Sequence, residues 1–443
     1  MRPDVLVLPQ DEEALARRMA RRRALFDRSL LADVARLFDD VAARGDQAVR
    51  EATARHDGAQ VAELRLGPDR MDACVAAMAA ELRGAVDLAI RHVEEVNRAL
   101  MPPPTWEREI RPGTLVGERA TPLEAVGLWV PARKAPLVST AVMLAAAARV
   151  AGVPRIVVAM PPRADGSPDP ATVAAARLAG AGEAVVGNGV GTIAALALGT
   201  ESVPEVDGIF GPGPGAIAAA MATAFAYGKR TTMGIGPSDG MVLADASASP
   251  ARVARDLVNE AEHGPDSAAV LVTTSGPLAE RTAEELAAAI AEAAAPRRGF
   301  LEAVFGSEGR GALAVAPDLE TACQVVDRFA PEHLMIACER HAAREALARI
   351  HHAGEILLGH HTPFSAANYA IGITAVLPTN GLARVFSGVT CRDMLKHSTL
   401  ASLDPEALAA LWPAIRALGE HEGLPGHVAA ARTRVEERGG GAG

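Results

Sequence analysis

Two different spacings of apolar residues divide the chain. Residues 1 to about 100 carry the spacing of surface helices with strongly charged faces. From about residue 124, short apolar runs such as "AVGLWVP", "RIVVAMPP" and "EAVVGNG" alternate with alanine-rich stretches, and a second series follows from "GMVLAD" onward. Short apolar strands separated by helices are typical of β-α units on a mostly parallel sheet. The pattern therefore predicts an α/β fold with two such domains.

The same changes of pattern predict how the chain is divided. A return of the chain from one domain to the other is expected near residues 230–240. The expected parts are an N-terminal helical segment (1–25), a first, discontinuous α/β domain (26–128 and 237–380), a second α/β domain (129–236), a C-terminal helical segment (381–438) and a disordered tail (439–443).

One predicted helix ends with a carboxylate and an imidazole. Ser249 can cap this helix, Pro250 suits its first position, and a Gly-Pro pair after residue 263 ends it. Glu260 and His263 are three residues apart and therefore project from one face of the last turn. This geometry suits a metal ion, a substrate or a plain surface pair, and the helix alone does not decide among them.

A second acid-imidazole pair, Glu332 and His333, stands in "FAPEHL" between a predicted helix and a predicted strand. An imidazole titrates near neutral pH and can take a proton from an alcohol, while a carboxylate can activate water. Most isolated Glu-His pairs are structural, so this pair gains weight only from the sequence around it.

Two glycine-rich turns precede predicted helices, "GNGVGTIAAL" (187–196) and "GPGPGAIAAAM" (211–221). Either turn could hold a phosphate at a helix N-terminus. Neither follows the G-x-G-x-x-G pattern, and similar turns also serve as tight β-α connections. Both interpretations stay open.

Composition narrows the class of protein. The net charge of −10 and the aromatic content of 3% argue against nucleic acid and against an anionic membrane surface. No apolar run reaches membrane-spanning length, and the four cysteines form neither a disulfide framework nor a thiolate zinc site. We expect a cytoplasmic protein that acts on a small molecule.

Seven segments, in order over about 300 residues, resemble the histidinol dehydrogenase family: "GLWVPARKAPLVSTAVML", "ALGTESVPEVDGIFGPG", "GPSDGMVLAD", "NEAEHGPDSAAVLVT", "FAPEHL", "TPFSAANYAIGITAVLPT" and "EGLPGH". The resemblance implies a homodimer with two Rossmann-like domains and a C-terminal segment that reaches the partner's active site. It also implies Zn²⁺, NAD and two successive hydride transfers, from a primary alcohol through an aldehyde to a carboxylate. The first domain would carry the active site and the second the cofactor.

The resemblance also assigns roles to residues of this chain. His333 would deprotonate the alcohol, and Glu332 would help water attack the aldehyde. The implied zinc ligands are Glu260, His263, Asn368 and His427. The implied substrate contacts are Ser238, Glu260, His263, His333, Asn368, Glu422 and His427, and Trp129 would lie near the adenine end of the cofactor.

Two of these positions depart from the family in a paired way. The family typically has Gln at Glu260 and Asp at Asn368, so the amide and the carboxylate are exchanged while the summed charge stays the same. Such an exchange is easiest to explain if both residues meet one ion. An Asn carbonyl is a less usual zinc ligand than a carboxylate, so Asn368 could contact the substrate instead.

Other departures bear on the substrate. Ala375 stands where histidinol dehydrogenases have a histidine before "VLPT", and "ANYAIG…AVLPT" looks similar to the sulfopropanediol dehydrogenase branch. From these we expect oxidation of an anionic alcohol such as 2,3-dihydroxypropane-1-sulfonate to sulfolactate, with L-histidinol to L-histidine as the alternative. Four cations either receive the anionic group or are simply solvated: Arg133, Lys134, Arg384 and Arg392.

The cofactor side departs as well, because Gly191 and Pro214 replace a Gln and an Asn that contact the cofactor in the family. NAD remains the expected hydride acceptor. Two other classes of function stay open, a zinc hydrolase that uses the Glu-His pair to activate water, and a silent binding protein that has kept the fold.

Overall fold

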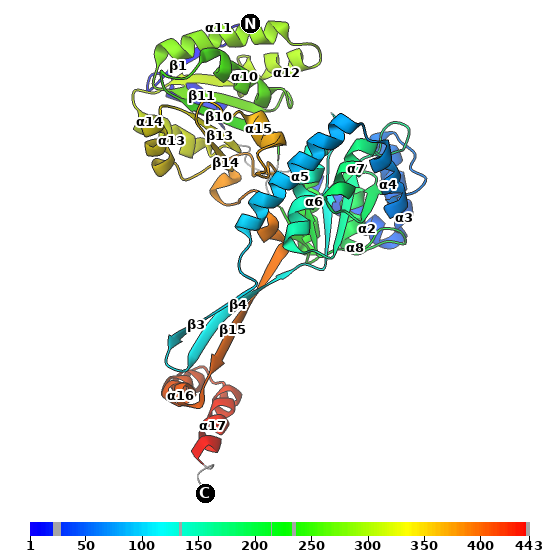
Figure 1. Cartoon of the computed structure of the whole chain (residues 1–443), viewed down its shortest axis with the longest axis vertical. Coiled ribbons are helices and arrows are strands. Elements are labelled where there is room, and N and C mark those ends of the chain that lie inside the picture. The colour runs from blue at the N-terminus through cyan, green and yellow to red at the C-terminus, as the bar shows by residue number, and fades with distance from the viewer. Residues whose placement is uncertain (21–27, 133–134, 214, 233–235, 440–443) are drawn as a thin grey trace. The chain divides into compact units, whose positions relative to one another are not determined.

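The computed structural model describes residues 1–20, 28–132, 135–213, 215–232 and 236–439. The chain forms two compact units (Figure 1). The first unit contains Met1–Leu100 and Leu123–Met394, and the second contains Met101–Pro122 and Leu395–Gly443. Arg133, Lys134 and Pro214 lie outside the described residues, as does most of the expected tail at 439–443.

One six-stranded parallel sheet of the first unit is built almost wholly from the second half of the chain. Its order is β1 (Val5–Val7), β12 (Ala312–Val315), β11 (Ala268–Thr273), β10 (Asp239–Ala244), β13 (His333–Ala337) and β14 (Glu355–Leu358). Residues on β10 and β11 are buried throughout, as expected for strands covered on both faces.

Helices cover both faces of this sheet. One apolar cluster joins it to α1 (Glu12–Arg18), α13 (Leu319–Phe329) and α14 (Arg340–Arg349). The other joins it to α10 (Pro250–Ala261), α11 (Gly276–Glu292), α12 (Arg297–Phe305) and α15 (Phe364–Tyr369). The N-terminal segment expected to be helical therefore also supplies an edge strand, β1.

The other six-stranded sheet has the order β2 (Arg65–Leu66), β7 (Glu183–Val186), β6 (Arg155–Met160), β5 (Ala125–Trp129), β8 (Gly208–Phe210) and β9 (Arg230–Thr231). All its pairs are parallel except β2 with β7. One group of contacting helices comprises α4 (Pro68–Ala77), α5 (Ala80–Leu100), α6 (Val138–Ala151) and α7 (Pro170–Ala179). The other comprises α2 (Arg28–Arg44), α3 (Asp46–Asp57), α8 (Gly189–Leu198) and α9 (Gly215–Ala226).

This arrangement differs from the expected boundaries, which grouped residues 26–128 with 237–380. Helices α2 to α5 contact the helices of the β5 sheet instead. Their apolar stripes, such as Val86, Ile90 and Val93 on α5, could be predicted from helical spacing. An apolar stripe shows that a helix is covered, but it does not show by which sheet.

The second unit consists of a three-stranded antiparallel sheet and two helices. The strand order is β15 (Leu395–Leu403), β4 (Thr114–Pro122) and β3 (Thr105–Arg111), and the helices are α16 (Pro405–His421) and α17 (Pro425–Gly439). The segment 381–438 is thus not wholly helical. It holds two short 3₁₀ turns, Leu382–Arg384 and Cys391–Met394, and then β15, whose partner β4 lies far away in the sequence.

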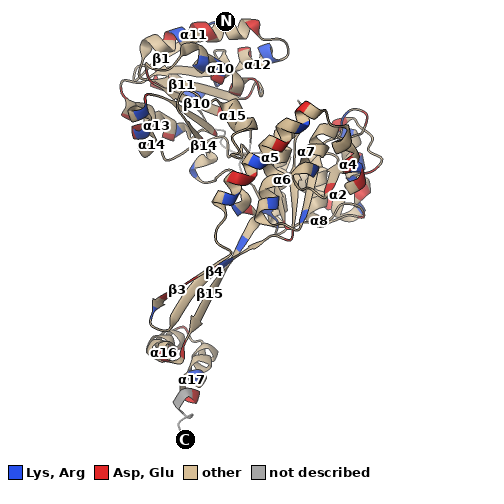
Figure 2. Ribbon diagram, in the orientation of Figure 1, with Lys and Arg blue, Asp and Glu red and all other residues tan. Residues whose placement is uncertain are grey.

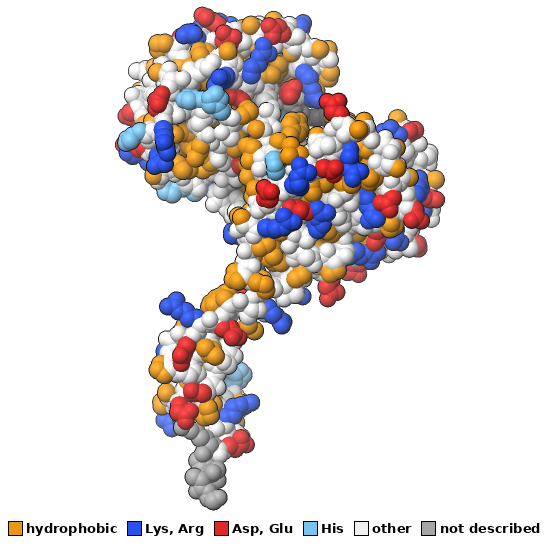
Figure 3. Space-filling view, in the orientation of Figure 1, with side chains coloured by type: hydrophobic (Ala, Val, Ile, Leu, Met, Phe, Trp, Pro, Cys, Tyr) orange, Lys and Arg blue, Asp and Glu red, His pale blue; other side chains and the backbone are white. Residues whose placement is uncertain are grey.

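The predicted fold class is confirmed, with mostly parallel sheets and helical segments at both ends. Charged residues gather on the helices, and few mark the strands of the large sheets (Figure 2). Basic and acidic side chains are interspersed over the visible face (Figure 3). Among the described helices, none combines the length and apolarity that crossing a membrane requires.

Candidate active site

The candidate site forms where three parallel strands begin. Residue His333 opens β13 and pairs in register with Gly240 of β10 on one side and with Glu355 of β14 on the other. Helix α10 follows β10, and Glu260 in its last turn lies beside the same strand. A Cβ placed on Gly240 would lie 2.3 Å from Cγ of Glu260, so this close approach of helix and strand requires glycine.

The chain enters β13 through a tight turn. Helix α13 ends at Phe329, and Ala330 adopts a left-handed conformation with φ of 54°. Such a conformation costs a non-glycine residue about 1–2 kcal/mol. The turn allows Glu332 and His333 to follow the helix immediately and to stand at the edge of the sheet.

Two carboxylates flank the imidazole of His333. Its Nε2 lies 3.5 Å from Oε1 of Glu332, and its Nδ1 lies 2.6 Å from Oε1 of Glu355. The three side chains are only 6–8% exposed. The Phe364 ring packs edge-on against the imidazole, with 5.8 Å between centroids and an angle of 67° between planes. The ring of His333 is therefore fixed from three directions.

Asp239 holds Glu332 in place through reciprocal hydrogen bonds. The backbone N–H of Glu332 donates to Oδ1 of Asp239 at 2.7 Å, and the backbone N–H of Asp239 donates to Oε2 of Glu332 at 3.1 Å. The second oxygen of Asp239 accepts from the backbone N–H of Asn380 at 2.6 Å. These contacts leave Oε1 of Glu332 facing His333.

Burial raises the pKa of three acids in this cluster, Asp239, Glu260 and Glu332. Burial alone would lower the pKa of His333, but the charges of Glu260 and Glu332, with hydrogen bonds to Glu332 and Glu355, hold it well above its usual value. A site with several buried acids and one imidazole carries an excess of negative charge. A bound cation would offset this excess.

Glu260 is suited to such a cation. Its side chain is 1% exposed, Oε1 accepts from Nδ2 of Asn259 at 3.0 Å, and Oε2 has no hydrogen-bond partner among the described residues. The charges of His333 and His263 both favour the ionised form of Glu260. One turn earlier on α10, burial and then the charge of Glu260 raise the pKa of Asp256 to about 7. A buried carboxylate oxygen without a donor, near an imidazole, fits a zinc ligand set.

The remaining predicted zinc ligands lie on other elements. Asn368 is half-buried on α15, the helix whose first residue is Phe364, while Glu422 and His427 are exposed in the second unit. Over the described ranges, no three or more His, Cys, Asp or Glu side chains are grouped in a way that could hold a metal ion. The four-residue ligand set therefore stays a prediction. Ser238 directly precedes β10 and is half-buried, and its carbonyl accepts from the N–H of Ala268 at 3.0 Å.

Trp129 lies at the carboxyl end of β5. The order of strands reverses here, with β6 and β7 on one side of β5 and β8 and β9 on the other. Ligands of α/β sheets bind outside the carboxyl ends of strands at such a point. Trp129 is 3% exposed, and its Nε1 has no partner among the described residues. A Cβ on Gly211 would lie 2.1 Å from the Trp129 carbonyl oxygen, which explains this glycine.

The first glycine-rich turn caps its own helix. The side chain of Asn188 accepts from the N–H groups of Val190 and Gly191 at 3.2 and 3.3 Å, which are the groups that a phosphate would use. A Cβ on Gly191 would lie 3.6 Å from Ala52 of α3, so the position that is Gln in the family faces a helix here. This turn is therefore a tight β-α connection, and the polar contact expected in the family is absent from it.

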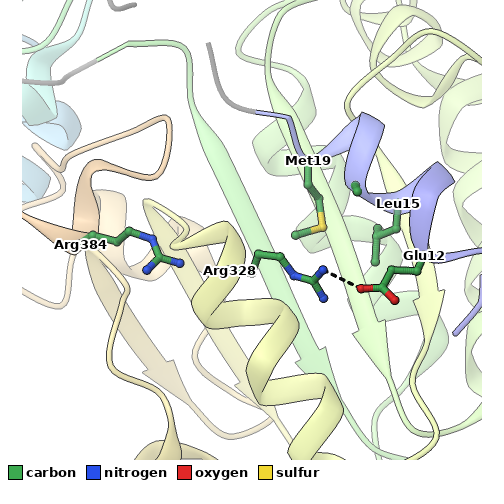
Figure 4. Close-up of a pocket in the computed structure, with 6 residues that line it drawn as sticks. Glu12, Leu15, Met19, Arg328 and Arg384 are labelled. Carbon is green, nitrogen blue, oxygen red and sulfur yellow. Dashed lines mark hydrogen bonds and ion pairs between the residues drawn. The ribbon is translucent and has the colours of Figure 1, made fainter. Parts of the chain in front are cut away.

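Both described candidate cations are exposed, and each donates one hydrogen bond to a backbone oxygen. Arg384 donates to the backbone oxygen of Asp327, and Nε of Arg392 donates to the backbone oxygen of Leu100 at 2.7 Å. Arg384 also lines a cavity of about 340 Å³ with Glu12, Leu15, Ala16, Met19 and Arg328 (Figure 4). In that cavity Arg328 pairs with Glu12 at 2.7 Å, and none of the acids around His333 contributes to its lining.

The structure thus adds Asp239, Glu355 and Phe364 to the residues that the sequence identified. Asp239 stands in "GPSDG", one of the resembling motifs, so its position could have been noticed. Glu355 and Phe364 carry no local signal, because they reach His333 only through strand pairing and helix packing.

Known proteins resemble the whole chain. Residues 20–435 match the family described as histidinol dehydrogenase. The histidinol dehydrogenase of Methanosarcina mazei is 37% identical over 91% of this chain and 92% of its own length, and that of Synechocystis sp. is 39% identical over 91% and 92%. The solved histidinol dehydrogenase of Elizabethkingia anophelis is 29% identical, with a TM-score of 0.91 over 99% of both chains.

These relatives correct the expected substrate. The prediction of an anionic alcohol such as 2,3-dihydroxypropane-1-sulfonate is wrong, because relatives that are 37–39% identical over most of the chain are histidinol dehydrogenases. The prediction gave too much weight to Ala375. Losing one hydrogen-bond partner costs about 1–3 kcal/mol, which weakens binding of a substrate without excluding it.

The relatives also bear on the class of protein and its cofactors. Histidinol dehydrogenases are zinc- and NAD-dependent oxidoreductases, so the predicted cofactors Zn²⁺ and NAD are those of the family. None of these relatives supports the two alternative classes, a zinc hydrolase or a silent binding protein. Members of the family act on a small molecule and are typically dimeric. With the match spanning residues 20–435, the chain belongs to the histidinol dehydrogenase family.

Proposed function

We propose that this protein oxidises L-histidinol to L-histidine in two NAD-linked steps. The observation that carries the proposal is the buried His333 between Glu332 and Glu355, at the start of a strand that lies close to Glu260 in the last turn of α10. The names of the relatives supply the substrate. In the first step the alcohol loses a hydride and a proton to give an aldehyde. In the second, the hydrated aldehyde loses a further hydride and two protons to give the carboxylate, so two NAD⁺ become two NADH.

His333 is the proposed base of the first step. Its Nε2 would take the hydroxyl proton while the hydride leaves the adjacent carbon. The contact of Nδ1 with Glu355 at 2.6 Å and the edge-on packing of Phe364 support this role, because they hold the ring with Nε2 directed toward Glu332. A base must be held within hydrogen-bond reach of the proton it removes.

Glu332 is proposed to assist water in the second step. Its carboxylate accepts the N–H of Asp239, which fixes one oxygen and leaves the other near His333. Burial raises the pKa of Glu332, and a carboxylate with a raised pKa is a stronger base toward water than an exposed one.

Zinc would be held by Glu260 and His263, with Asn368 and His427 as the other proposed ligands. The buried, unpartnered Oε2 of Glu260 supports this assignment. When bound, zinc would supply a Lewis acid that orients and polarises the substrate. Ser238 and Glu422 are proposed as further substrate contacts, and Trp129 as a wall of the NAD site beside β5.

The second unit is proposed to complete the site of a partner subunit in a homodimer. Glu422 and His427 are exposed in this unit, which supports a role outside its own small core. A cytoplasmic location also stays a prediction.

The test is the number of NADH molecules formed per molecule of limiting L-histidinol by the purified, zinc-loaded protein. Two NADH, with L-histidine as product, is the expected result. No NADH from histidinol, with zinc at full occupancy and a folded dimer, would contradict the proposal.

A further inference from the structure

The pairing of strands β13 and β14 at their first residues places Glu355 beside the imidazole of His333. Strands β13 and β14 are parallel neighbours, and His333 pairs in register with Glu355. The backbone N–H of Glu355 donates to the carbonyl of Glu332 at 2.9 Å, so the pairing starts at this residue. Gly354 permits the approach, since a Cβ there would lie 2.5 Å from the same carbonyl oxygen. Side chains at paired positions of neighbouring strands lie on one face of the sheet.

The carboxylate of Glu355 is costly where it stands. Its side chain is 6% exposed, Oε1 contacts Nδ1 of His333 at 2.6 Å, and Oε2 has no partner among the described residues. A buried carboxylate with one oxygen unbonded destabilises the folded state, and an apolar side chain of similar volume would avoid that cost. Stability of the fold alone would therefore favour an apolar side chain over Glu355 at this position.

Hydrogen-bond chemistry indicates what this charge does. A neutral imidazole carries one proton, and both of its neighbours are carboxylates, which can only accept. The shorter contact decides which nitrogen keeps the proton: Nδ1 lies 2.6 Å from Glu355, while Nε2 lies 3.5 Å from Glu332, so Nδ1 is the protonated nitrogen of the neutral ring. The lone pair is then on Nε2, the nitrogen 3.5 Å from Glu332. When Nε2 takes a proton, the imidazolium that forms lies against a fixed negative charge.

We propose that Glu355 is a positioning residue that holds His333 in the tautomer with a free Nε2 and stabilises its protonated form. The inference rests on the proposed function for the identity of the proton donor. In the step concerned, the substrate hydroxyl proton goes to Nε2, the hydride goes to NAD⁺, and the proton later returns to solvent. Glu355 exchanges no proton and touches no substrate, so it acts through His333 alone.

The experiment uses three variants of the zinc-loaded protein. Glu355→Gln keeps the size but loses the charge, and its amide can donate to Nδ1 and so impose the wrong tautomer. Glu355→Leu removes the hydrogen bond. Removal of such a supporting group lowers activity by about 10- to 10⁴-fold. We therefore expect kcat for histidinol to fall by at least tenfold in both variants, with KM and zinc content unchanged.

Glu345→Gln is the control, because it removes the same charge from the surface of α14, where Glu345 pairs with Arg349 at 2.8 Å.

A purely structural role for Glu355 predicts a different outcome. Both variants would then melt earlier while their folded fraction kept the kcat of the parent protein. Equal kcat in the parent and in Glu355→Gln would overturn the proposal. A parent protein that is inactive with histidinol would instead contradict the proposed function.

A measurement that needs no turnover separates these two failures. In protein labelled with ¹⁵N-histidine, the signals of His333 are those missing from a His333→Gln variant. At a pH high enough for the ring of His333 to be neutral, we expect the proton to be on Nδ1 in the parent protein, and we expect the Nε2-protonated form to appear in Glu355→Leu. An unprotonated Nδ1 in the parent protein, or the same tautomer in both, overturns the assignment of Glu355 whatever the substrate is.

Discussion

At the scale of single residues, buried charge is concentrated around one imidazole. Asp239, Glu260, Glu332 and Glu355 each have less than a tenth of their surface exposed, and His333 is the buried base among them. Burial raises the pKa of the first three, so ionising all of them together is unfavourable without a cation. This balance gives a physical reason for a divalent ion beside Glu260.

Replacing Glu332 by Gln should separate the two oxidation steps. The amide keeps the size of the side chain and can still accept from the N–H of Asp239, but it cannot take a proton from water. Loss of one general base typically slows a step by about 10²–10⁴-fold, so we expect the variant to stall after the aldehyde. The check is NADH per histidinol in a single turnover, with the aldehyde trapped by a hydrazine. Two NADH formed at the parental rate would remove Glu332 from the second step.

Replacing Gly240 by Ala should disturb the predicted metal site without touching a charged residue. The new Cβ would lie 2.3 Å from Cγ of Glu260, so the carboxylate has to move. Overpacking of this kind costs about 1–3 kcal/mol, and we expect both a lower melting temperature and weaker zinc binding.

The matched control for Gly240→Ala is Gly299→Ala in helix α12, where nothing lies within 4 Å of the added Cβ. That change should be neutral or should stabilise the fold by about 0.5–1 kcal/mol. Zinc binding equal in both variants, by titration against a chelator, would argue that the packing of Glu260 against β10 has no part in the metal site.

At the scale of elements, the contacts that could be predicted from the sequence join residues close together in the chain. The contacts that could not be predicted join residues far apart in the chain. Glu332 and His333 are adjacent in the chain, so this pair could be predicted from the sequence. The predicted pairing of Glu260 with His263 on one helix face differs from the structure, because α10 ends at Ala261 with Glu260 buried, and His263 lies exposed in the turn that follows. Glu355 reaches His333 only because β14 pairs with β13. Strand β15 was missed for the same reason, since its partner β4 lies more than 270 residues earlier. Local spacing contains no information about such partners.

A buried carboxylate, that of Asp46, links the start of helix α3 to the loop after helix α8. Asp46 opens α3, and its oxygens accept from Oγ1 of Thr200 at 2.6 Å and from Oγ of Ser202 at 2.7 Å. Burial raises the pKa of Asp46, but these hydrogen bonds outweigh burial and bring the pKa below its ordinary value. The loop after α8 is thereby tied to the first turn of α3.

Replacing Asp46 by Asn should therefore cost stability in a pH-dependent way. A pKa below that of the unfolded chain, about 3.9, means that the stabilisation is present at neutral pH and is lost as pH falls toward the folded-state value. We expect Asp46→Asn to lower the free energy of unfolding by about 1.5–3 kcal/mol at pH 7, and by less near pH 3, which lies below the pKa of the unfolded chain. Urea unfolding at both values measures this.

Asp72→Asn is the comparison for Asp46→Asn, because Asp72 forms a surface pair with Arg177 and is 57% exposed. Exposed pairs contribute little to stability, because water and salt screen them. A loss for Asp46→Asn that is the same at pH 7 and near pH 3 would show that the hydrogen bonds do not depend on the carboxylate charge.

At the scale of the whole molecule, the second unit has little core of its own. Its buried apolar side chains among the described residues are Leu395, Ala407 and Val428. Six larger apolar side chains of the unit are between 39% and 62% exposed: Trp106, Ile110, Leu115, Leu403, Leu418 and Leu424. Apolar surface of this extent is typical of an interaction site. A second copy of the chain fits, because the family is typically dimeric.

If the second unit completes the site of the partner subunit, two inactive variants should restore each other. His427→Ala alters only the second unit, and His333→Ala alters only the first. In a mixed dimer, one site would combine the unaltered first unit of one subunit with the unaltered second unit of the other, and the remaining site would carry both changes. Random pairing makes half of the dimers mixed, so co-expression should recover about one quarter of the parental activity. If each second unit served its own subunit, every site would carry one change, and the mixture would stay as inactive as either variant alone.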